Sequence, residues 1–203
     1  MINRRKSKQL TIGNVKIGGD APISVQSMCN TDTRDINSTL NQIKEMADKG
    51  CELVRLAVLN QDAADAIREI VKKSPVPLIA DIHFDYKLAV QCINNGKREN
   101  VEKVVTLAKQ QSIPIRIGVN AGSLEKDLYN LDIPLSEKMV LSALGHIKIL
   151  EDLDFDLIKV SLKSSDVLTT IEAYRSISEK IPYPLHLGAV SYTHLRAHET
   201  SAH

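Results

Sequence analysis

The segment Pro114–Leu162 (PIRIGVNAGSLEKDLYNLDIPLSEKMVLSALGHIKILEDLDFDLIKVSL) decides the fold class of this chain. It begins with a short apolar run, Pro114–Val119 (PIRIGV), and ends with a second, Leu157–Leu162 (LIKVSL). Between them lies a long amphipathic stretch, Ser136–Leu153, which predicts a helix. Two nearly continuous apolar strands joined through a helix are typical of parallel strands that are buried on both faces.

The same alternation extends over most of the chain. Further strands are predicted over Pro22–Met28, Leu53–Val58, Pro77–Ile82 and Pro184–Gly188. The remaining predicted helices are Ile36–Lys49, Gln61–Lys73, Tyr86–Asn95, Asn100–Gln111 and Val167–Lys180. Asp35 is the expected N-cap of the first helix, and Gly50 is expected to end it. The pattern indicates an α/β protein with a parallel sheet.

We favour a TIM (β/α)8-type barrel over an open, doubly wound sheet. Leu10–Gly19 (LTIGNVKIGG) predicts a small N-terminal β-hairpin of the kind that closes the bottom of a barrel. Polar residues also recur at strand ends, where barrel active sites are built. No glycine-rich fingerprint follows the first strand, which argues against a dinucleotide-binding fold.

The barrel is expected to be incomplete. Between the strands that begin at Pro77 and Pro114, two helical segments follow one another, joined by Gly96-Lys97-Arg98. Parallel strands need a crossover that leads to another strand, and here the crossover leads straight into a second helix. One strand, the fourth, is therefore expected to be missing.

The composition limits the class of protein. With 43% hydrophobic and 25% charged residues, the 203-residue chain is expected to form one sizeable core, and without Trp that core should be aliphatic. The net charge of +1 leaves no electrostatic footprint for nucleic acid or for an anionic membrane. No apolar run approaches the roughly 20 residues that span a bilayer.

A cytoplasmic location is the expectation. The basic start Arg4–Lys8 is not followed by the apolar stretch of a signal peptide. Cys29, Cys51 and Cys92 are too widely spaced for a CxxC metal site and do not suggest a disulfide framework. We expect buried or half-buried thiols in a reducing compartment, and we predict no metal site in this chain.

Polar side chains recur at the carboxyl ends of the predicted strands. In chain order they are Gln26, Ser27, Arg55, Asp81, His83, Arg116, Asn120, Lys159, Ser161, Lys163 and His186. Because the ends of parallel strands share one rim, these groups are expected to converge. Arg and Lys together with Ser or Asn donors are what a phosphate or diphosphate needs, so the pattern predicts an anion site.

Arg55, Arg116 and Lys159 carry this prediction. A charged residue at a strand end is often solvated or paired with a neighbouring helix, but these three lie within apolar strands. Burial there without a partner costs several kcal/mol. The loop Asn120–Asp127 adds small residues and backbone N–H groups that suit a phosphate-facing turn.

Three other rim residues have two interpretations each. His83 and His186 are either catalytic or are rim histidines with satisfied hydrogen bonds. Asp81, between Ala80 and Ile82, is either the ionic partner of Arg55 or a ligand of the substrate.

Four blocks of sequence resemble the hydroxymethylbutenyl diphosphate synthase family of the methylerythritol phosphate pathway. They are Ala21–Met28 (APISVQSM), Ala80–Tyr86 (ADIHFDY), Pro114–Glu125 (PIRIGVNAGSLE) and Ile158–Lys163 (IKVSLK). The blocks are long, stand in the order of the family, and make the resemblance extend over roughly residues 4–188. The chain is similar to the N-terminal barrel domain of that family.

The resemblance implies an oxidoreductase of isoprenoid biosynthesis. Such enzymes open the ring of 2-C-methyl-D-erythritol 2,4-cyclodiphosphate reductively, with electrons passed from flavodoxin or ferredoxin through a [4Fe–4S] cluster. Their barrel holds the diphosphate, and they look like homodimers in which the cluster domain of one subunit closes the barrel of the other. Carried over by motif, the substrate-binding residues are Arg55, Asp81, His83, Arg116, Asn120, Lys159 and Ser161; no catalytic residue is assigned.

The chain departs from the family pattern in several places. A strand of the type R-I-N-P-G-N-I-G is absent between Gly96 and Lys97, and Ala189-Val190-Ser191-Tyr192 stands where the family has V-T-E-A-G. The eighth strand and the iron–sulfur domain are expected to be missing, and no cysteine here matches a cluster ligand. We expect a partial barrel over residues 1–190, marginal stability and no turnover.

The segment Ser191–His203 (SYTHLRAHETSAH) is expected to be a non-family tail. Its composition changes abruptly where the family pattern stops, as out-of-frame or adapter-derived coding sequence would. His194 and His198 have the spacing of a zinc helix, but that spacing alone is a weak signal.

Two other functions remain open at this point. A barrel of the dihydropteroate synthase type would bind an anionic diphosphate at the same rim without a redox cofactor. An inert, diphosphate-binding fragment would retain only the rim itself.

Overall fold

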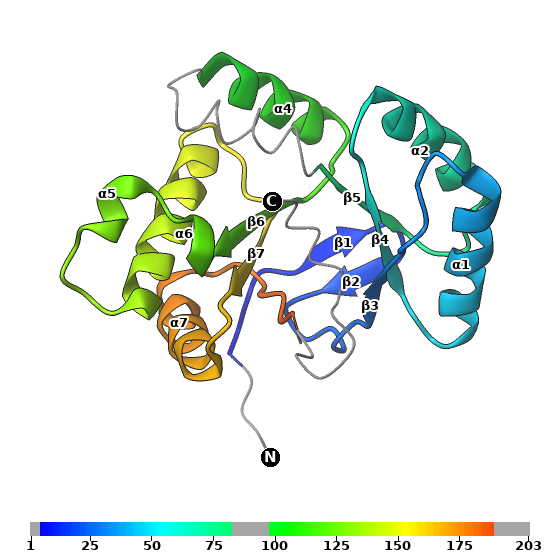
Figure 1. Cartoon of the computed structure of the whole chain (residues 1–203). Helices are drawn as coiled ribbons and strands as arrows, with labels where there is room; N and C mark the ends of the chain where they lie inside the picture. Colours follow the sequence, from blue (N-terminus) through cyan, green and yellow to red (C-terminus); the bar gives the residue numbers. More distant parts are fainter. Residues whose placement is uncertain (1–4, 83–97, 189–203) are drawn as a thin grey trace. The chain divides into compact units, whose positions relative to one another are not determined.

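Parallel strands flanked by helices form the framework in the computed structural model, which describes residues 5–82 and 98–188 (Figure 1). The strands are β1 (Leu10–Ile12), β2 (Val15–Ile17), β3 (Gln26–Met28), β4 (Leu53–Ala57), β5 (Leu78–Asp81), β6 (Ile115–Asn120) and β7 (Ile158–Lys163). The helices are α1 (Ile36–Asp48), α2 (Gln61–Lys73), α4 (Arg98–Gln110), α5 (Lys126–Tyr129), α6 (Leu135–Glu151) and α7 (Val167–Lys180), with a 3-10 turn, η1, at Ala121–Ser123.

Contacts divide the chain into two compact units. Among the described residues, unit 1 comprises 5–10, 18–21 and 108–188, and unit 2 comprises 11–17, 22–82 and 98–107. Each unit holds its own parallel sheet, which is β6–β7 in unit 1 and β3–β4–β5 in unit 2.

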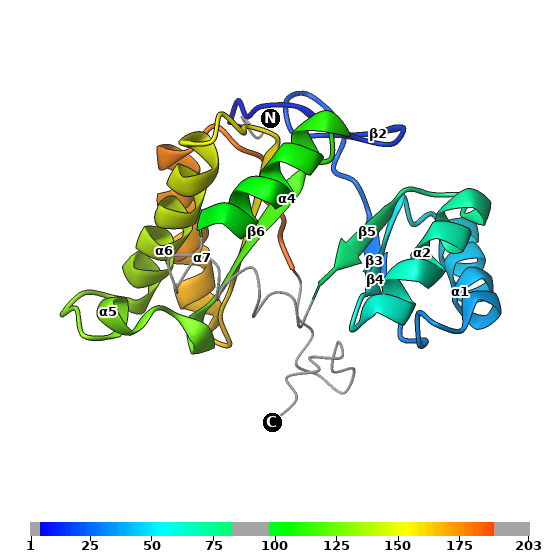
Figure 2. The same ribbon diagram turned by 90° about the horizontal axis from the view of Figure 1, so that it is seen from above.

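In unit 2, α1 and α2 cover one face of the β3–β4–β5 sheet (Figure 2). Val54 and Leu56 of β4 are fully buried against Ile43 of α1 and Ile70 of α2. Because side chains alternate along a strand, Arg55 lies on the opposite face of β4. The helical layer therefore fixes the orientation of this arginine.

Side-chain caps begin both helices of unit 2. The Asp35 carboxylate accepts a hydrogen bond from Ser38 N at 3.1 Å, and the Asn60 side chain accepts one from Ala63 N at 3.0 Å. These bonds satisfy N–H groups that have no partner within the helix. Gly50 follows α1 with φ of 89°, so the predicted start and end of this helix are both confirmed.

The predicted N-terminal hairpin is confirmed as the strand pair β1–β2. Its turn includes Gly13 with φ of 59°, and a Cβ at this position would lie 2.7 Å from Cγ of Pro77. Pro77 directly precedes β5, so the hairpin turn packs at the amino end of that strand. This is the end at which a barrel-closing hairpin was expected.

In unit 1, β6 and β7 pair in parallel along their whole length, from Ile115 with Ile158 to Asn120 with Lys163. Ile158, Val160 and Leu162 are at most 1% exposed, and α6 and α7 pack against these strands. Met139 and Ile177 supply fully buried side chains from the two helices. The apolar side chains of these strands thus face the helices, and the polar side chains between them face away, so the two strands alternate and are not continuously apolar as the sequence suggested.

Two predicted strands are shorter in the structure by more than two residues. Pro22–Met28 forms a ladder only over β3, because the Val25 N–H donates to the Glu52 carboxylate at 2.8 Å instead of to a neighbouring strand. Pro184–Gly188 is reduced to a single parallel bridge between Leu185 and Val160. Helix bounds agree with the predictions to within two residues.

Several predictions fall on parts of the chain that the structure does not describe. They include the helix over Tyr86–Asn95, His83, Cys92 and the tail Ser191–His203. The interval with the missing fourth strand also falls largely there, so the deletion stays a prediction. Across residues 5–82 and 98–188, the strands form separate sheets and no closed barrel.

Two further expectations can be compared with this part of the chain. Cys29 and Cys51 are both free and buried, as expected for these two thiols. None of the helices in the described ranges is both long and apolar enough to cross a bilayer.

Candidate functional site: a basic strand face and a buried ion pair

The polar face of β6 and β7 brings four of the predicted site residues together. Three rows of register partners cross it, namely Arg116 with Lys159, Gly118 with Ser161, and Asn120 with Lys163. Parallel partners point to the same side of a sheet, and residues two apart on a strand are roughly 7 Å apart. The face therefore has two rows that carry cations, separated by one row of small residues.

The middle row leaves room above the sheet. A Cβ built on Gly118 would meet nothing within 4 Å, and its partner Ser161 is a small side chain at 1% exposure. The Ser161 hydroxyl lies near the Tyr174 hydroxyl without meeting hydrogen-bond geometry, and it has no hydrogen-bond partner among the described residues. A buried hydroxyl of this kind is available to donate to a ligand.

Lys159 is the most buried cation of this face, at 7% exposure. Burial and, to a smaller extent, the nearby Arg116 guanidinium lower the pKa of Lys159 to about 8. Both influences act against the charged form of the amine. An anion bound between the two side chains would stabilise the charged form of Lys159 instead, so the arrangement favours binding of negative charge.

The loop after β6 starts at Asn120, whose side-chain oxygen accepts a hydrogen bond from Gly122 N at 3.1 Å. This bond shapes η1, which lies within the loop Asn120–Asp127 that was predicted to suit a phosphate-facing turn. The Gly122 N–H is thus used within the loop itself. The predicted phosphate-facing turn is therefore a short helical turn held by one of the predicted site residues.

Glu125, near the end of this loop, connects it to α6 through two side-chain contacts. Its Oε1 accepts a hydrogen bond from Ser142 Oγ at 3.1 Å and contacts His146 Nε2 at 2.7 Å. Burial lowers the pKa of His146, while the Glu125 carboxylate acts in the opposite direction. The imidazole is therefore neutral at pH 7 and donates its Nε2–H to the carboxylate.

In unit 2, Arg55 and Asp81 form a buried ion pair. Arg55 Nε donates to Asp81 Oδ2 at 2.6 Å, and its Nη2 contacts the same oxygen. The side chains are 13% and 17% exposed, respectively. Of the two interpretations of Asp81, the structure shows the ionic partner of Arg55.

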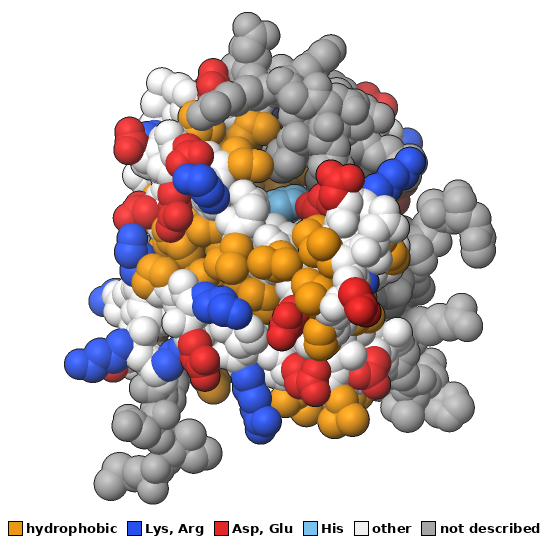
Figure 3. All heavy atoms as spheres, turned by 90° about the vertical axis from the view of Figure 1, so that its left-hand side faces the viewer, with side chains coloured by type: hydrophobic (Ala, Val, Ile, Leu, Met, Phe, Trp, Pro, Cys, Tyr) orange, Lys and Arg blue, Asp and Glu red, His pale blue; other side chains and the backbone are white. Residues whose placement is uncertain are grey.

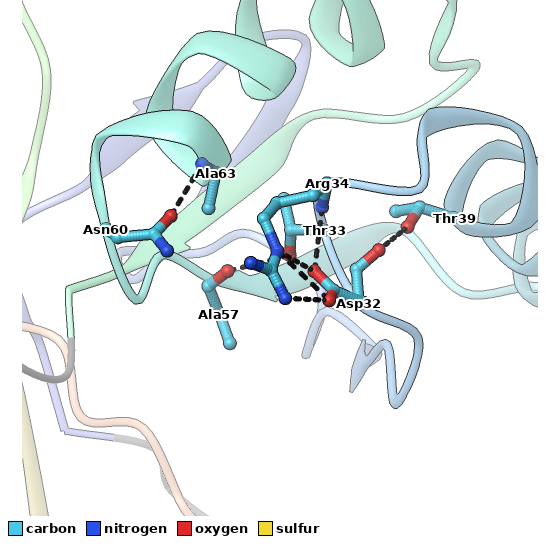
Figure 4. Close-up of polar contacts among 7 residues, drawn as sticks. All are labelled: Asp32, Thr33, Arg34, Thr39, Ala57, Asn60 and Ala63. Atoms are coloured by element: carbon cyan, nitrogen blue, oxygen red, sulfur yellow. Dashed lines mark hydrogen bonds and ion pairs between the residues drawn. The ribbon is translucent and has the colours of Figure 1, made fainter.

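Two loops border the carboxyl end of β4 (Figure 4). Thr33, 3% exposed, donates from its hydroxyl to the Ala57 carbonyl oxygen at 2.7 Å and so ties the loop after β3 to the end of β4. Arg34 is exposed and is held by Asp32 through Nε and Nη2. This loop was missed in the sequence, because its polar and charged residues resemble those of an ordinary solvated turn.

The predicted site residues therefore fall into two groups. Arg116, Asn120, Lys159 and Ser161 share one strand face of unit 1, and Arg55 and Asp81 pair with each other in unit 2. His83 lies outside the described residues. The Glu125–His146 contact was missed, since its partners are 21 residues apart and no local pattern joins them.

Comparison with known proteins identifies relatives of the whole chain. The family model described as the GcpE TIM-barrel domain matches residues 7–195. A 4-hydroxy-3-methylbut-2-en-1-yl diphosphate synthase (flavodoxin) of Geobacter sulfurreducens is 54% identical over 198 residues, which cover 91% of this chain and 56% of that protein.

Other relatives carry the same name. The protein of Dehalococcoides mccartyi strain BAV1 is 54% identical over 200 residues, covering 93% of this chain and 57% of its own length. The protein of Clostridium perfringens is 52% identical over 200 residues, with 92% and 57% covered. The chain thus spans just over half the length of these relatives. With a family model matched over almost all of its residues, the chain belongs to the GcpE TIM-barrel family.

Proposed function

We propose that this chain is the substrate-binding barrel domain of a flavodoxin-dependent 4-hydroxy-3-methylbut-2-en-1-yl diphosphate synthase. The substrate would be 2-C-methyl-D-erythritol 2,4-cyclodiphosphate, and the complete enzyme would open its ring reductively. Names of relatives at 52–54% identity support the reaction. The observation that carries the binding role is the pair Arg116 and Lys159, adjacent on one face of a parallel strand pair.

The chemistry of this face suits two linked phosphoryl groups. Arg116 offers a planar fork of donors for bidentate contact with phosphoryl oxygens, and Lys159 offers a compact positive charge beside it. The space above Gly118 would take the ligand between the two basic rows. Ser161 would donate from its buried hydroxyl, and Asn120 would bind at the carboxyl edge.

The second group, Arg55 with Asp81 and His83, is proposed to complete the substrate site. The Asp81 carboxylate keeps the Arg55 guanidinium oriented before a ligand arrives. A fixed guanidinium loses less side-chain entropy on binding than a mobile one. The incomplete TIM (β/α)8-type barrel predicted from the sequence is proposed as the fold that carries these residues.

A [4Fe–4S] cluster is implied by the family, and the described residues do not fit it. No group of three His, Cys, Asp or Glu side chains in the described ranges could hold a metal. Cys29 is buried at 5% exposure, and burial raises the pKa of its thiol to about 11. A cluster ligand must instead be a thiolate. We therefore propose a binding role for this domain and assign no electron-transfer step to its residues.

The complete enzyme is proposed to be a homodimer that receives its electrons from flavodoxin. Apolar side chains gather on the face of unit 1 that α5, α6 and α7 form (Figure 3). Val167, Leu168 and Ile171, at the start of α7, are 42–70% exposed. An apolar surface of this kind is typical of a protein contact. Light scattering across a concentration series would test whether this surface forms the dimer. The parent chain is expected to dimerise, and Leu168→Glu is expected to stay monomeric.

Calorimetric titration of the purified chain with the cyclodiphosphate tests the binding role. The parent chain is expected to bind, and Arg116→Ala is expected to abolish detectable heat. Arg175→Ala, which removes an exposed arginine from α7, is the matched control and should leave binding unchanged.

Folding is checked separately so that the result stays interpretable. Urea unfolding of each protein should be cooperative, and Lys159→Met provides a second variant should Arg116→Ala fail to fold. A cooperatively folded parent that binds no cyclodiphosphate would refute the proposal. Equal affinity of the parent, Arg116→Ala and Lys159→Met would refute the assigned site.

A further inference from the structure

Tyr174 of α7 places its hydroxyl between two backbone segments of unit 1. The side chain is buried at 8% exposure. Its Oη accepts a hydrogen bond from Leu162 N of β7 at 3.0 Å and donates one to the carbonyl oxygen of His186. One phenol thus bridges a strand N–H and a carbonyl of the segment that follows α7.

The adjoining ladder shows which bond this hydroxyl replaces. Val160 N donates to Pro184 O at 3.0 Å, and His186 N donates to Val160 O at 2.8 Å, around the parallel bridge of Val160 with Leu185. In a regular parallel ladder the next bond would run from Leu162 N to His186 O. The Tyr174 hydroxyl stands in that position, so the pairing ends there.

The insertion changes the spacing at the carboxyl edge of β7. A direct ladder bond holds its nitrogen and oxygen roughly 2.9 Å apart, whereas here two hydrogen bonds in series separate Leu162 N from His186 O. The two segments therefore diverge immediately after Ser161. This is the edge on which the predicted anion ligands lie.

The phenol is also close to the anion-binding face itself. Burial raises the pKa of Tyr174, and the nearby Ser161 hydroxyl and Arg116 guanidinium act in the opposite direction. As a neutral phenol, Tyr174 can be donor and acceptor at once, which its two backbone bonds require. The same group therefore contacts the strand edge and neighbours two predicted substrate ligands.

We propose that Tyr174 is a positioning residue, whose hydroxyl keeps Leu162 N of β7 and the His186 carbonyl oxygen apart and so sets the neighbouring Ser161 for the diphosphate. The proposal rests on the function proposed above for the same face. It assigns Tyr174 no contact with the reacting atoms. Its effect should appear in ligand affinity, separately from the stability of the fold.

The experiment compares Tyr174→Phe with Tyr183→Phe. Tyr183 is a matched control, because it is also buried and its hydroxyl donates to Glu151 Oε1 at 2.6 Å, away from the basic rows. Affinity for the cyclodiphosphate is measured where urea titration shows each variant to be fully folded. Tyr174→Phe is expected to bind about tenfold more weakly, and Tyr183→Phe is expected to bind as the parent does.

A second readout needs no ligand. The NMR scalar coupling across a direct hydrogen bond between Leu162 N and the His186 carbonyl carbon should be absent in the parent and present in Tyr174→Phe, where the gap can close. Unchanged affinity in Tyr174→Phe, or no such coupling in the variant, would overturn the spacer role. A parent chain that binds no cyclodiphosphate would instead refute the function proposed above, and the coupling would still decide the spacing.

Discussion

Replacing Lys159 with methionine is expected to stabilise the folded chain while weakening anion binding. Lys159 is 7% exposed and stands opposite Arg116, and burial followed by this guanidinium lowers its pKa from 10.5 to about 8. Because each pKa unit corresponds to about 1.4 kcal/mol, holding the charge at pH 7 costs the folded state roughly 3 kcal/mol. Methionine fills a similar volume without charge, so roughly 2–3 kcal/mol should be recovered.

The pH dependence of the stability gained in Lys159→Met follows from the lowered pKa of Lys159 in the folded state. Between pH 8 and pH 10.5 the folded state has released the Lys159 proton and the unfolded state still binds it. The free energy of unfolding of the parent therefore rises with pH over this window, by about 1.4 kcal/mol per pH unit. The advantage of Lys159→Met should be largest at pH 7 and should fall by about 2 kcal/mol by pH 9.5.

Urea unfolding at the two pH values measures this advantage. Lys109→Met removes an exposed lysine from α4 and should change stability little at either pH. A Lys159→Met chain no more stable than the parent at pH 7, with the Lys109→Met chain unchanged, would refute the electrostatic reasoning. A stability advantage of Lys159→Met that stays constant from pH 7 to pH 9.5 would also refute this reasoning.

Three further predictions concern the rest of the described structure. Asp81→Asn should lower the free energy of unfolding by about 3–5 kcal/mol, because it leaves the Arg55 guanidinium, only 13% exposed, without its carboxylate; a loss below about 1 kcal/mol in urea titration would contradict this. His146 has a pKa lowered by burial, so the unfolded state takes up its proton first and stability should fall as the pH drops below about 6.5. Urea midpoints at pH 7.5 and pH 5.5 measure this loss of stability. His146→Asn should lose less stability on acidification than the parent, and an equal loss would show that protonation of His146 is not its cause. The thiol of Cys29, with its pKa raised to about 11 from 9.0, should react with iodoacetamide at pH 8 about a hundredfold more slowly than a free thiol, as followed by peptide mass spectrometry.

The basic face of unit 1 could be predicted from the sequence because strand alternation encodes it. In β6 and β7 every second residue is Ile, Val or Leu, and the residues between them include Arg116, Asn120, Lys159 and Ser161. Once the two strands pair in parallel, the period of two places these four side chains on one side. The register that makes Arg116 the neighbour of Lys159 is then set by the turn and helix between the strands.

Other contacts of the site could not be predicted, because they depend on tertiary packing. Tyr174 has the spacing of an ordinary core aromatic on α7, and nothing local indicates that its hydroxyl replaces a ladder bond. Likewise, His146 would pass for one more residue of an amphipathic helix until Glu125 is placed beside it. The sequence also allowed two roles for Asp81, and only the folded structure showed the contact with Arg55.

Arg5 illustrates how synthesis and folding of this chain are connected. Its guanidinium donates to the carbonyl oxygens of Ser178, Ile181 and Tyr183, which lie 173–178 residues further along the chain. On the ribosome, the segment around Arg5 must therefore wait until α7 and the residues after it are made before these bonds can form. Contacts of such long sequence separation are slow to close, so the last step of folding in unit 1 is expected to be docking of the segment around Arg5 after its partners have left the exit tunnel.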